Sequence, residues 1–214
     1  MVPILIIGMK VACLFSGGKD SCFSLFWAIA QGFEPFLITV KAEEDSTMFH
    51  HPNIEKTKLQ TEAIGIEQHF LETNENEWHE ELKVLLKKTK AEGIVSGALA
   101  SEYQRRRIER VGEELDIPTY APLWHKEDVV LEEMLQYFEI YVTSVSAEGL
   151  GKELLGKPLK KLINKKVKGI HPLLEGGEGE TFVSNAPFFK KKLEIKRWEI
   201  KWDGIRGTAE IKNS

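Results

Sequence analysis

Hydrophobic and polar positions along the first 122 residues follow two different periods. Short apolar runs rich in β-branched and aromatic residues predict β-strands near residues 11–15, 36–40, 67–71, 94–97 and 119–121. Between them, apolar residues recur every three or four positions and predict amphipathic helices near residues 19–31, 54–64, 77–90 and 103–115. Strands that alternate with helices of this length are typical of βαβ units. We therefore expect an α/β domain with a doubly wound parallel sheet and helices on both faces.

Three glycines follow the first three predicted helices, at Gly32, Gly65 and Gly93. The residue that ends a helix often adopts a left-handed conformation, which glycine takes without strain. We therefore expect these glycines at the helix C-caps.

The pattern changes after residue 122. A further helix is predicted near residues 126–138, a strand near 140–145 and a short helix near 159–167. We interpret residues 1–128 as an ATP-binding domain and residues 129–214 as a smaller α+β substrate-binding domain.

The C-terminal tail shows strand periodicity with one slip. Apolar residues at 193 and 195 alternate with charged ones, and those at 198, 200 and 202 alternate in the opposite phase. This slip predicts a β-bulge near residues 196–197. Asp203 and Gly204 then predict a hairpin turn into residues 205–212.

Composition narrows the class of protein. Of 214 residues, 42% are hydrophobic and 29% charged, which excludes a disordered chain, and the net charge of −4 provides no overall basic field. We therefore expect no direct nucleic-acid binding and no membrane association. Cys13 and Cys22 are the only cysteines, which favours a reducing cytoplasm over a disulfide-stapled secreted domain. Residues 2–9 are too short an apolar run to span a bilayer, and Met9 is a second candidate for the start of the chain.

A glycine-containing loop between the first strand and the first helix has the properties of an anion site. Glycines let the backbone approach a ligand, and the N–H groups at the start of the helix point toward it. In a doubly wound sheet, ligands also bind beyond the carboxyl ends of the strands. The loop consists of Ser16, Gly17, Gly18, Lys19, Asp20 and Ser21.

This loop is not a Walker A motif, because that pattern requires glycine where Cys13 stands and Ser or Thr where Asp20 stands. It resembles instead the pyrophosphate loop of the N-type ATP pyrophosphatases, which have an adenine nucleotide alpha hydrolase-like fold. The resemblance implies ATP cleavage between the α- and β-phosphates, with Lys19 as a phosphate contact and Asp20 as the Mg²⁺ contact. The competing interpretation is a glycine-rich turn that binds no ligand.

Members of this superfamily differ in the group that they adenylate. Sulfur-inserting members and those with a built-in glutaminase use cysteines away from the loop, and this chain has none beyond Cys22. An amide-forming enzyme that takes free ammonia remains.

The second half of the chain points to one such family. Residues 169–182 resemble the Glu-Gly-Gly-Glu-Xaa-Glu-Thr element of the diphthine–ammonia ligases, and residues 96–104 and 48–53 resemble two further loops of that family. Leu174 and Gly179 depart from its common residues, which are glycine and an aromatic residue. The resemblance implies that ATP adenylates the diphthine carboxylate of translation elongation factor 2 and that ammonia then displaces AMP.

The same resemblance, together with the crowding of three carboxylates among glycines, makes the acidic loop the candidate site for the quaternary ammonium of diphthine. The acceptor would bind between this loop and the pyrophosphate loop. A Mg²⁺ site and an exposed turn without a ligand are the alternatives. The loop residues concerned are Glu175, Gly176, Gly177, Glu178, Glu180 and Thr181.

The helix near residues 103–115 can be analysed at about 100° per residue. Ile108, Val111 and Leu115 define its buried face, which Gln104 shares at the end nearest the strand tips. Arg105 and Arg107 lie on the flanks of that face, and Arg106 points away. We expect Gln104 and Arg107 to act in catalysis and Tyr103 and Gln104 to contact the substrate. Alternatively, Arg105, Arg107 and Arg110 pair with Glu109, Glu113 and Glu114 on a solvated face.

The adenine site is the last expectation. The superfamily places the base near the second strand, so the resemblance assigns it to the backbone of Thr39 and Val40, with Gly97 also at the nucleotide. His50 and His51 lie in the following loop, where solvent contacts are the commoner role of histidine. Three alternatives stay open: another carboxylate acceptor, a transfer RNA, or a nucleotide-binding sensor without catalysis. A homo-oligomer is compatible with the sequence.

Overall fold

A computed structural model describes residues 8–42, 53–74, 76–98, 102–146, 148–165, 168–171, 173–174 and 176–212. Inside these ranges a few side chains are not described, namely those of Ala42, Gln104, Glu127, Asp128, Val129 and Lys165. Residues 1–7, the two histidines His50 and His51, and Glu175 lie outside the described residues.

The chain forms two compact units, and neither is a continuous stretch of sequence. The first consists of Met1–Ser16, Asp20–His50 and Ile66–His125, and the second of Gly17–Lys19, His51–Gly65 and Lys126–Ser214. Two short segments of the N-terminal half therefore pack with the C-terminal half. The domain boundary at residue 128 stays a prediction.

The first unit is built on a five-stranded sheet in the order β3-β2-β1-β4-β5, in which every pair of neighbours is parallel. Each strand coincides within a few residues with a predicted one. Because β1 lies in the centre and the chain leaves it in both directions, the carboxyl ends of β1 and β4 form a topological switch point. The strands are β1 (Lys10–Leu14), β2 (Glu34–Ala42), β3 (Gln68–Thr73), β4 (Gly93–Val95) and β5 (Thr119–Tyr120).

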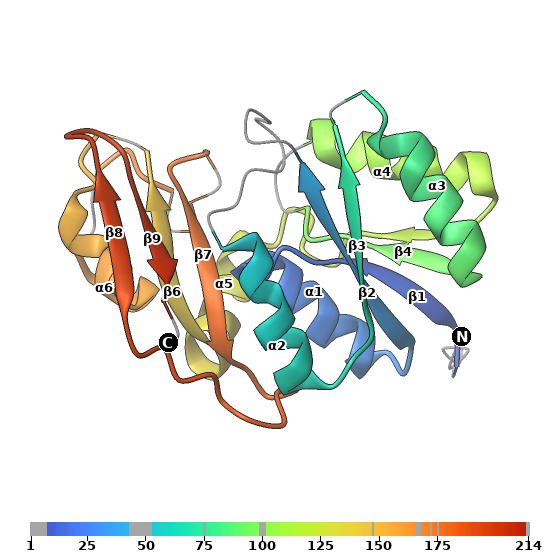
Figure 1. The fold of residues 1–214 in the computed structure, drawn as a ribbon, viewed down its shortest axis with the longest axis horizontal. Helices are drawn as coiled ribbons and strands as arrows, with labels where there is room; N and C mark the ends of the chain where they lie inside the picture. Colours follow the sequence, from blue (N-terminus) through green and yellow to red (C-terminus); the bar gives the residue numbers. More distant parts are fainter. Residues whose placement is uncertain are drawn as a thin grey trace. The chain divides into compact units, whose positions relative to one another are not determined.

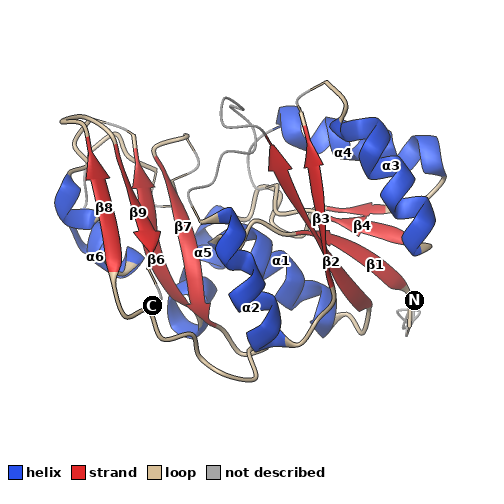
Figure 2. Ribbon diagram, in the orientation of Figure 1, coloured by secondary structure: helices blue, strands red, loops and turns tan. Residues whose placement is uncertain are grey.

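Helices cover both faces of this sheet (Figures 1 and 2). On one face, α3 (Trp78–Thr89) and α4 (Glu102–Leu115) bury Trp78, Leu82 and Val111 against apolar side chains of β1, β2 and β4. Successive strand residues point to opposite faces, and α1 (Lys19–Ala30) covers the other one. The predicted doubly wound α/β architecture is confirmed.

The glycine C-caps were predicted correctly for two helices and wrongly for one. Gly32 follows α1 with φ of 80°, and Gly65 follows α2 (Thr57–Ile64) with φ of 77°. Gly93 is instead the first residue of β4, and Lys90 caps α3 in the left-handed conformation with φ of 55°. The glycine pattern misled because a non-glycine residue pays only about 1–2 kcal/mol in that conformation, which the packing of α3 offsets.

The second unit contains a four-stranded sheet in the order β7-β6-β9-β8, antiparallel throughout. This is the smaller α+β arrangement that the changed pattern predicted. Its elements are η1 (Ile54–Lys56), α2 (Thr57–Ile64), α5 (Glu127–Tyr137), β6 (Glu139–Val145), η2 (Lys152–Leu154), α6 (Leu159–Lys165), β7 (Gly179–Asn185), β8 (Trp198–Trp202) and β9 (Gly207–Ile211).

The C-terminal hairpin is confirmed, whereas the bulge before it is wrong. Trp202 pairs with Gly207, and the Asp203 carboxylate accepts hydrogen bonds from the N–H groups of Ile205 and Arg206 at 2.8 and 2.7 Å. Residues 190–197 form no strand, and the N–H of Leu193 bonds to the carbonyl of Ser184 at 2.9 Å. The change of phase therefore marks the start of β8, and the register shifts of this sheet lie between β6 and β7.

Strand β7 was not predicted, because the sequence around it suggested an acidic turn. Its consecutive residues Phe182, Val183 and Ser184 are all buried, so no alternation of apolar and polar residues reveals the strand. Before this strand, Leu174 has φ of 60°, a left-handed conformation that glycine adopts without strain. In the part of the chain that the structure describes, no helix is both long and apolar enough to cross a membrane.

Candidate functional site

The glycine-containing loop lies where β1 ends and α1 begins. Ser16 and Ser21 are joined through their hydroxyl groups at 3.3 Å, and Ser21 is buried. Lys19 is the first residue of α1 and is only 3% exposed. Asp20 lies in the first turn of the helix. The loop thus combines a helix N-terminus, a lysine and an acidic residue, which suits a phosphate with its counterion.

Two backbone contacts connect this loop to β7. The N–H of Val183 donates to the carbonyl of Gly17 at 3.1 Å. The N–H of Lys19 donates to the Thr181 hydroxyl at 3.1 Å. The structure therefore places Thr181 beside the loop, although 162 positions of sequence separate it from Lys19.

Gly97 packs against the first turn of α1. A Cβ atom at this position would lie 3.0 Å from the carbonyl carbon of Asp20 and 3.0 Å from the nitrogen of Ser21. Such distances are tighter than most side-chain contacts, so the segment after β4 approaches the loop most closely with glycine at position 97. The hydroxyl of Ser24 also donates to the carbonyl of Ser96 at 3.1 Å.

Thr39 is fully buried in β2, one residue past the point at which this strand pairs with the last residue of β1. Its hydroxyl donates to the carbonyl of Phe15 at 2.7 Å and accepts from the Gln68 amide at 2.7 Å. The side chain therefore ties the end of β1 to its neighbours, and Val40 beside it is partly exposed. Binding of adenine by these two residues stays a prediction, and the histidines of the following loop lie outside the described residues.

Helix α4 presents its arginines as the helical periodicity predicts. Arg106 is 70% exposed and pairs with Glu102 at 2.7 Å. Arg107 instead contacts the hydroxyl of Tyr103 and lies over the Trp78 ring at 5.5 Å. The side chain of Gln104 lies outside the described part of the structure.

Arg105 occupies the other flank of the same helix. It pairs with Glu109 at 2.8 Å and lies 4.5 Å from the centre of the Trp124 ring. Arg110 pairs with Glu114 at 3.0 Å. The alternative of a solvated ion-pair face therefore holds for the pairs Arg105–Glu109 and Arg110–Glu114. It does not describe Arg107, whose contacts are with Tyr103 and Trp78.

The acidic loop is held by one of its own carboxylates. The two oxygens of Glu178 accept the N–H groups of His171 and Gly176 at 2.9 and 2.6 Å. Glu180 lies on β7, opposite Ser144 of β6. Gly177 has φ of 77° and open space around it. Glu178 thus shapes the loop, and its contact with an acceptor stays a prediction.

Both cysteines are buried, and their thiols are poor nucleophiles. Burial raises the pKa of the Cys13 thiol to about 12. Burial, followed by the charge of Asp20, raises the pKa of the Cys22 thiol well above its usual range. Thiolate is the reactive form of cysteine, so neither residue is suited to carry sulfur.

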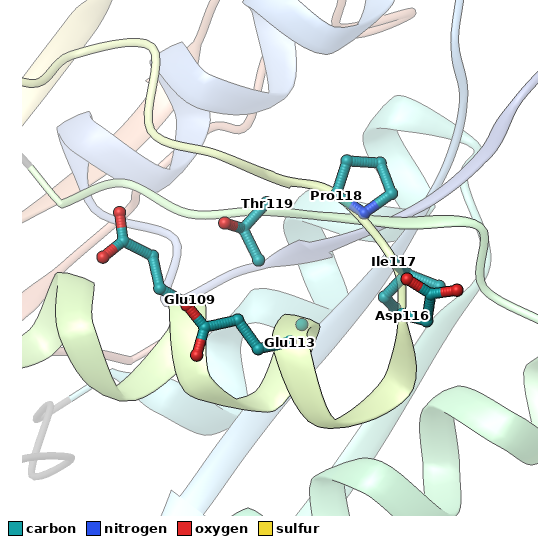
Figure 3. A pocket seen from close by; sticks show the side chains of 7 residues that line it. Glu109, Glu113, Asp116, Ile117, Pro118 and Thr119 are labelled. Carbon is teal, nitrogen blue, oxygen red and sulfur yellow. The ribbon is translucent and has the colours of Figure 1, made fainter.

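The first unit has a hollow at the C-terminal end of α4 (Figure 3). It is lined by Glu109, Glu113 and Asp116 of the α4 end and by the segment that leads into β5. Ligands of doubly wound sheets bind at the carboxyl ends of the strands, whereas this hollow lies at the amino end of β5. Its acidic lining is also unsuited to phosphates.

One buried polar residue was missed in the sequence. Gln60 of α2 is fully buried and contacts both Gly17 and Val183. The available signal was its helical spacing to Ala63 and Ile64, which places a glutamine on the inner face of an amphipathic helix. Among the described residues, no group of three His, Cys, Asp or Glu side chains could hold a metal ion.

Comparison with known proteins places both halves of the chain in one family. The family model of the diphthamide synthase N-terminal domain matches residues 9–118, and that of the diphthamide synthase C-terminal domain matches residues 126–214. The diphthine–ammonia ligase of Rattus norvegicus is 33% identical over 222 residues, covering 87% of this chain and 83% of that protein. The diphthine–ammonia ligase of Homo sapiens is also 33% identical, over 227 residues that cover 90% and 85%.

Among solved structures, a predicted subunit of tRNA methyltransferase from Methanocaldococcus jannaschii is similar over 88% of this chain and 100% of its own, with 17% identity and a TM-score of 0.45. A likeness at this level carries no argument about function. The family models and the curated relatives are sufficient: the chain belongs to the diphthamide synthase family.

Proposed function

We propose that this protein is an ATP-dependent ligase that converts the diphthine of translation elongation factor 2 into diphthamide. The observation that carries the proposal is the match to diphthine–ammonia ligases over both halves of the chain at about one third identity. The loop from Ser16 to Ser21, built as a phosphate site, supports ATP as the source of energy.

The reaction has two steps. A diphthine carboxylate oxygen attacks the α-phosphorus of ATP, the bond to the bridging oxygen of the β-phosphate breaks, and pyrophosphate leaves. Ammonia then attacks the acyl carbon, AMP leaves with the carboxylate oxygen, and the nitrogen loses a proton. The first step transfers negative charge to pyrophosphate, so donors fixed around the β- and γ-phosphates accelerate it.

In this proposal, the N-terminus of α1 and Lys19 bind the departing pyrophosphate. The N–H groups of a helix start carry partial positive charge, and they are already oriented before ATP arrives. Asp20 is the carboxylate that would hold Mg²⁺. One carboxylate is sufficient when phosphate oxygens and water complete the coordination, so the absence of a three-residue cluster among the described residues is compatible with this ion.

The acceptor would lie beside Thr181, whose hydroxyl accepts the N–H of Lys19. Glu178 and Glu180 supply negative charge near that point, which favours a quaternary ammonium group. Arg107 and Gln104 of α4 are the candidate catalytic residues of the first unit.

Product analysis tests the proposal. With diphthine-containing elongation factor 2 and ammonia, turnover should yield AMP and pyrophosphate, and Asp20→Ala should abolish it while the far-ultraviolet circular dichroism remains unchanged. Glu113→Ala, which removes an exposed carboxylate of the acidic hollow, is the matched control and should retain activity. Formation of ADP and orthophosphate, or intact diphthamide in a deletion strain, would refute the proposed reaction.

A further inference from the structure

Gln60 of α2 forms a hydrogen bond with the carbonyl group of Gly17, and both residues belong to the second unit. Its side-chain NH₂ group donates to the carbonyl of Gly17 at 2.9 Å and to the carbonyl of Val183 at 2.7 Å. Both partners are carbonyl oxygens, which accept hydrogen bonds, and only the nitrogen of a side-chain amide can donate to them. The partners therefore determine the orientation of the Gln60 amide group. The Gly17 carbonyl also accepts the N–H of Val183 at 3.1 Å. This carbonyl is therefore held by two donors.

The other end of the amide explains why residue 17 is glycine. A Cβ atom at Gly17 would overlap the side-chain oxygen of Gln60, and it would lie 3.0 Å from Cδ of Gln60 and from Cγ2 of Thr57. Gly17 also has φ of 77°, which side chains disfavour. With Gln60 and Thr57 in these positions, the loop can take this path only with glycine at position 17.

The side-chain oxygen of Gln60 is less well satisfied than its nitrogen. The Gln60 oxygen is buried and has no hydrogen-bond partner among the described residues. An unsatisfied buried acceptor destabilises the folded state. The two hydrogen bonds that the amide nitrogen donates offset part of this cost, and they also fix the direction of the Gly17 carbonyl.

The peptide bond that follows Gly17 transmits this direction to the phosphate-binding loop. A trans peptide is planar, so the N–H of Gly18 points opposite to the carbonyl of Gly17. With the carbonyl directed at Gln60 and β7, the N–H of Gly18 is directed away from them. A backbone N–H oriented in advance stabilises charge on a phosphate without reorganisation during the reaction.

We propose that Gln60 is a positioning residue that orients the Gly17–Gly18 peptide of the loop for the phosphates of ATP. The proposal rests on the proposed function in taking this loop as the phosphate site. Gln60 itself acts through Gly17 and does not touch the nucleotide.

Gln60→Met and Asn53→Leu form a matched pair for testing it. Methionine has about the length of glutamine but no hydrogen-bond donor. Leucine likewise has about the size of asparagine but no hydrogen-bonding group. Asn53 is another buried amide of the same segment, and it contacts Ala209 and Ile211 of β9 at 2.8 Å each. Both variants lose two hydrogen bonds to backbone groups, but only Gln60→Met loses a contact with the loop.

Calorimetric titration with ATP and Mg²⁺ and steady-state kinetics separate the two variants. We expect Gln60→Met to weaken ATP affinity and raise the KM for ATP at least about tenfold, with the KM for the acceptor within about threefold of the parent. Asn53→Leu should lose stability but keep the ATP affinity of the parent. Equal effects of the two variants on ATP affinity, or unchanged affinity in Gln60→Met, would overturn the inference. If the parent protein binds ATP but forms no AMP, the proposed reaction is refuted. The role of Gln60 is then still tested by comparing the ATP affinities of the two variants.

A double-mutant cycle tests the contact without catalysis. Gly17→Ala should be strongly destabilising because the new methyl group meets the Gln60 oxygen, and Gln60→Ala should relieve part of that cost. The unfolding equilibrium constant of the double variant should therefore be at least about fivefold smaller than the value obtained by multiplying the two single effects. Additive effects would show that the two residues do not interact and would contradict the proposal.

Discussion

At the scale of single residues, adjacent arginines of α4 have different surroundings. Arg106 is exposed and pairs with Glu102, whereas Arg107 lies against Tyr103 and Trp78. We expect Arg107→Ala to lower kcat/KM for AMP formation at least about tenfold, equivalent to about 1.4 kcal/mol of transition-state stabilisation. Arg106→Ala is the matched control and should be close to neutral. Equal losses in the two variants would contradict the assignment of Arg107.

His79 provides a second measurement at the same place. Its ring stacks on Trp78 at 3.9 Å between centroids. Burial, followed by the charges of Arg107 and Arg110, lowers the pKa of His79 from its usual 6.5. We expect Arg107→Ala to raise the pKa of His79, as measured by NMR titration of the ring, and Arg106→Ala to change it little. An unchanged pKa in Arg107→Ala would show that the two side chains do not interact in solution.

The same pKa shift has a consequence for stability. Because the folded protein holds His79 with a lowered pKa, the unfolded chain binds more protons once the pH falls below about 6.5. The His79 contribution therefore destabilises the folded state as the pH falls below that value and has no effect above it. Urea unfolding between pH 7.5 and 5.5 should show a smaller loss of stability in His79→Asn than in the parent. Identical pH profiles would contradict this expectation.

At the scale of elements, a substitution at the C-terminal end of α3 should stabilise the protein. Lys90 caps this helix with φ of 55°, and its exposed side chain has no packing role that requires lysine. Lys90→Gly should raise the free energy of unfolding by about 0.5–1 kcal/mol, because relief of the left-handed strain exceeds the extra entropy of glycine in the unfolded chain. Lys88→Gly, two residues earlier and within α3, should lower it by about 1 kcal/mol. Thermal or urea unfolding measures both, and a destabilised Lys90→Gly would refute the cap assignment.

At the scale of the whole molecule, segments of the N-terminal half belong to the second unit. Asn53 and Gln60 are buried there through contacts with Ala209, Ile211 and Val183. A fragment of residues 1–128 therefore leaves two buried amides without their partners. We expect it to unfold at a lower urea concentration than the full chain and with less cooperativity, as followed by circular dichroism. A fragment as stable as the full chain would show that residue 128 is a true domain boundary.

The local sequence pattern determined many structural features of this protein. The order of strands and helices in the first unit, the buried face of α4, the turn at Asp203 and the loop from Ser16 to Ser21 all follow from spacing and residue type within one short segment. Such features depend on neighbours in sequence, because a helix period, a turn or a glycine-rich loop is formed by local backbone geometry. The family resemblance was equally accessible, since its motifs are contiguous.

Contacts between distant segments were decided only by the tertiary structure. β7 was hidden because a strand buried on both faces has no alternation, and Lys90 replaced glycine at a cap because packing outweighs about 1–2 kcal/mol of backbone strain. Gln60 meets Gly17 across 43 positions, and Lys19 meets Thr181 across 162. Residue type reveals that a buried glutamine needs a partner, but only the folded chain selects that partner, because many backbone carbonyls compete for one amide and the packing of α2 and β7 leaves the Gly17 carbonyl within its reach.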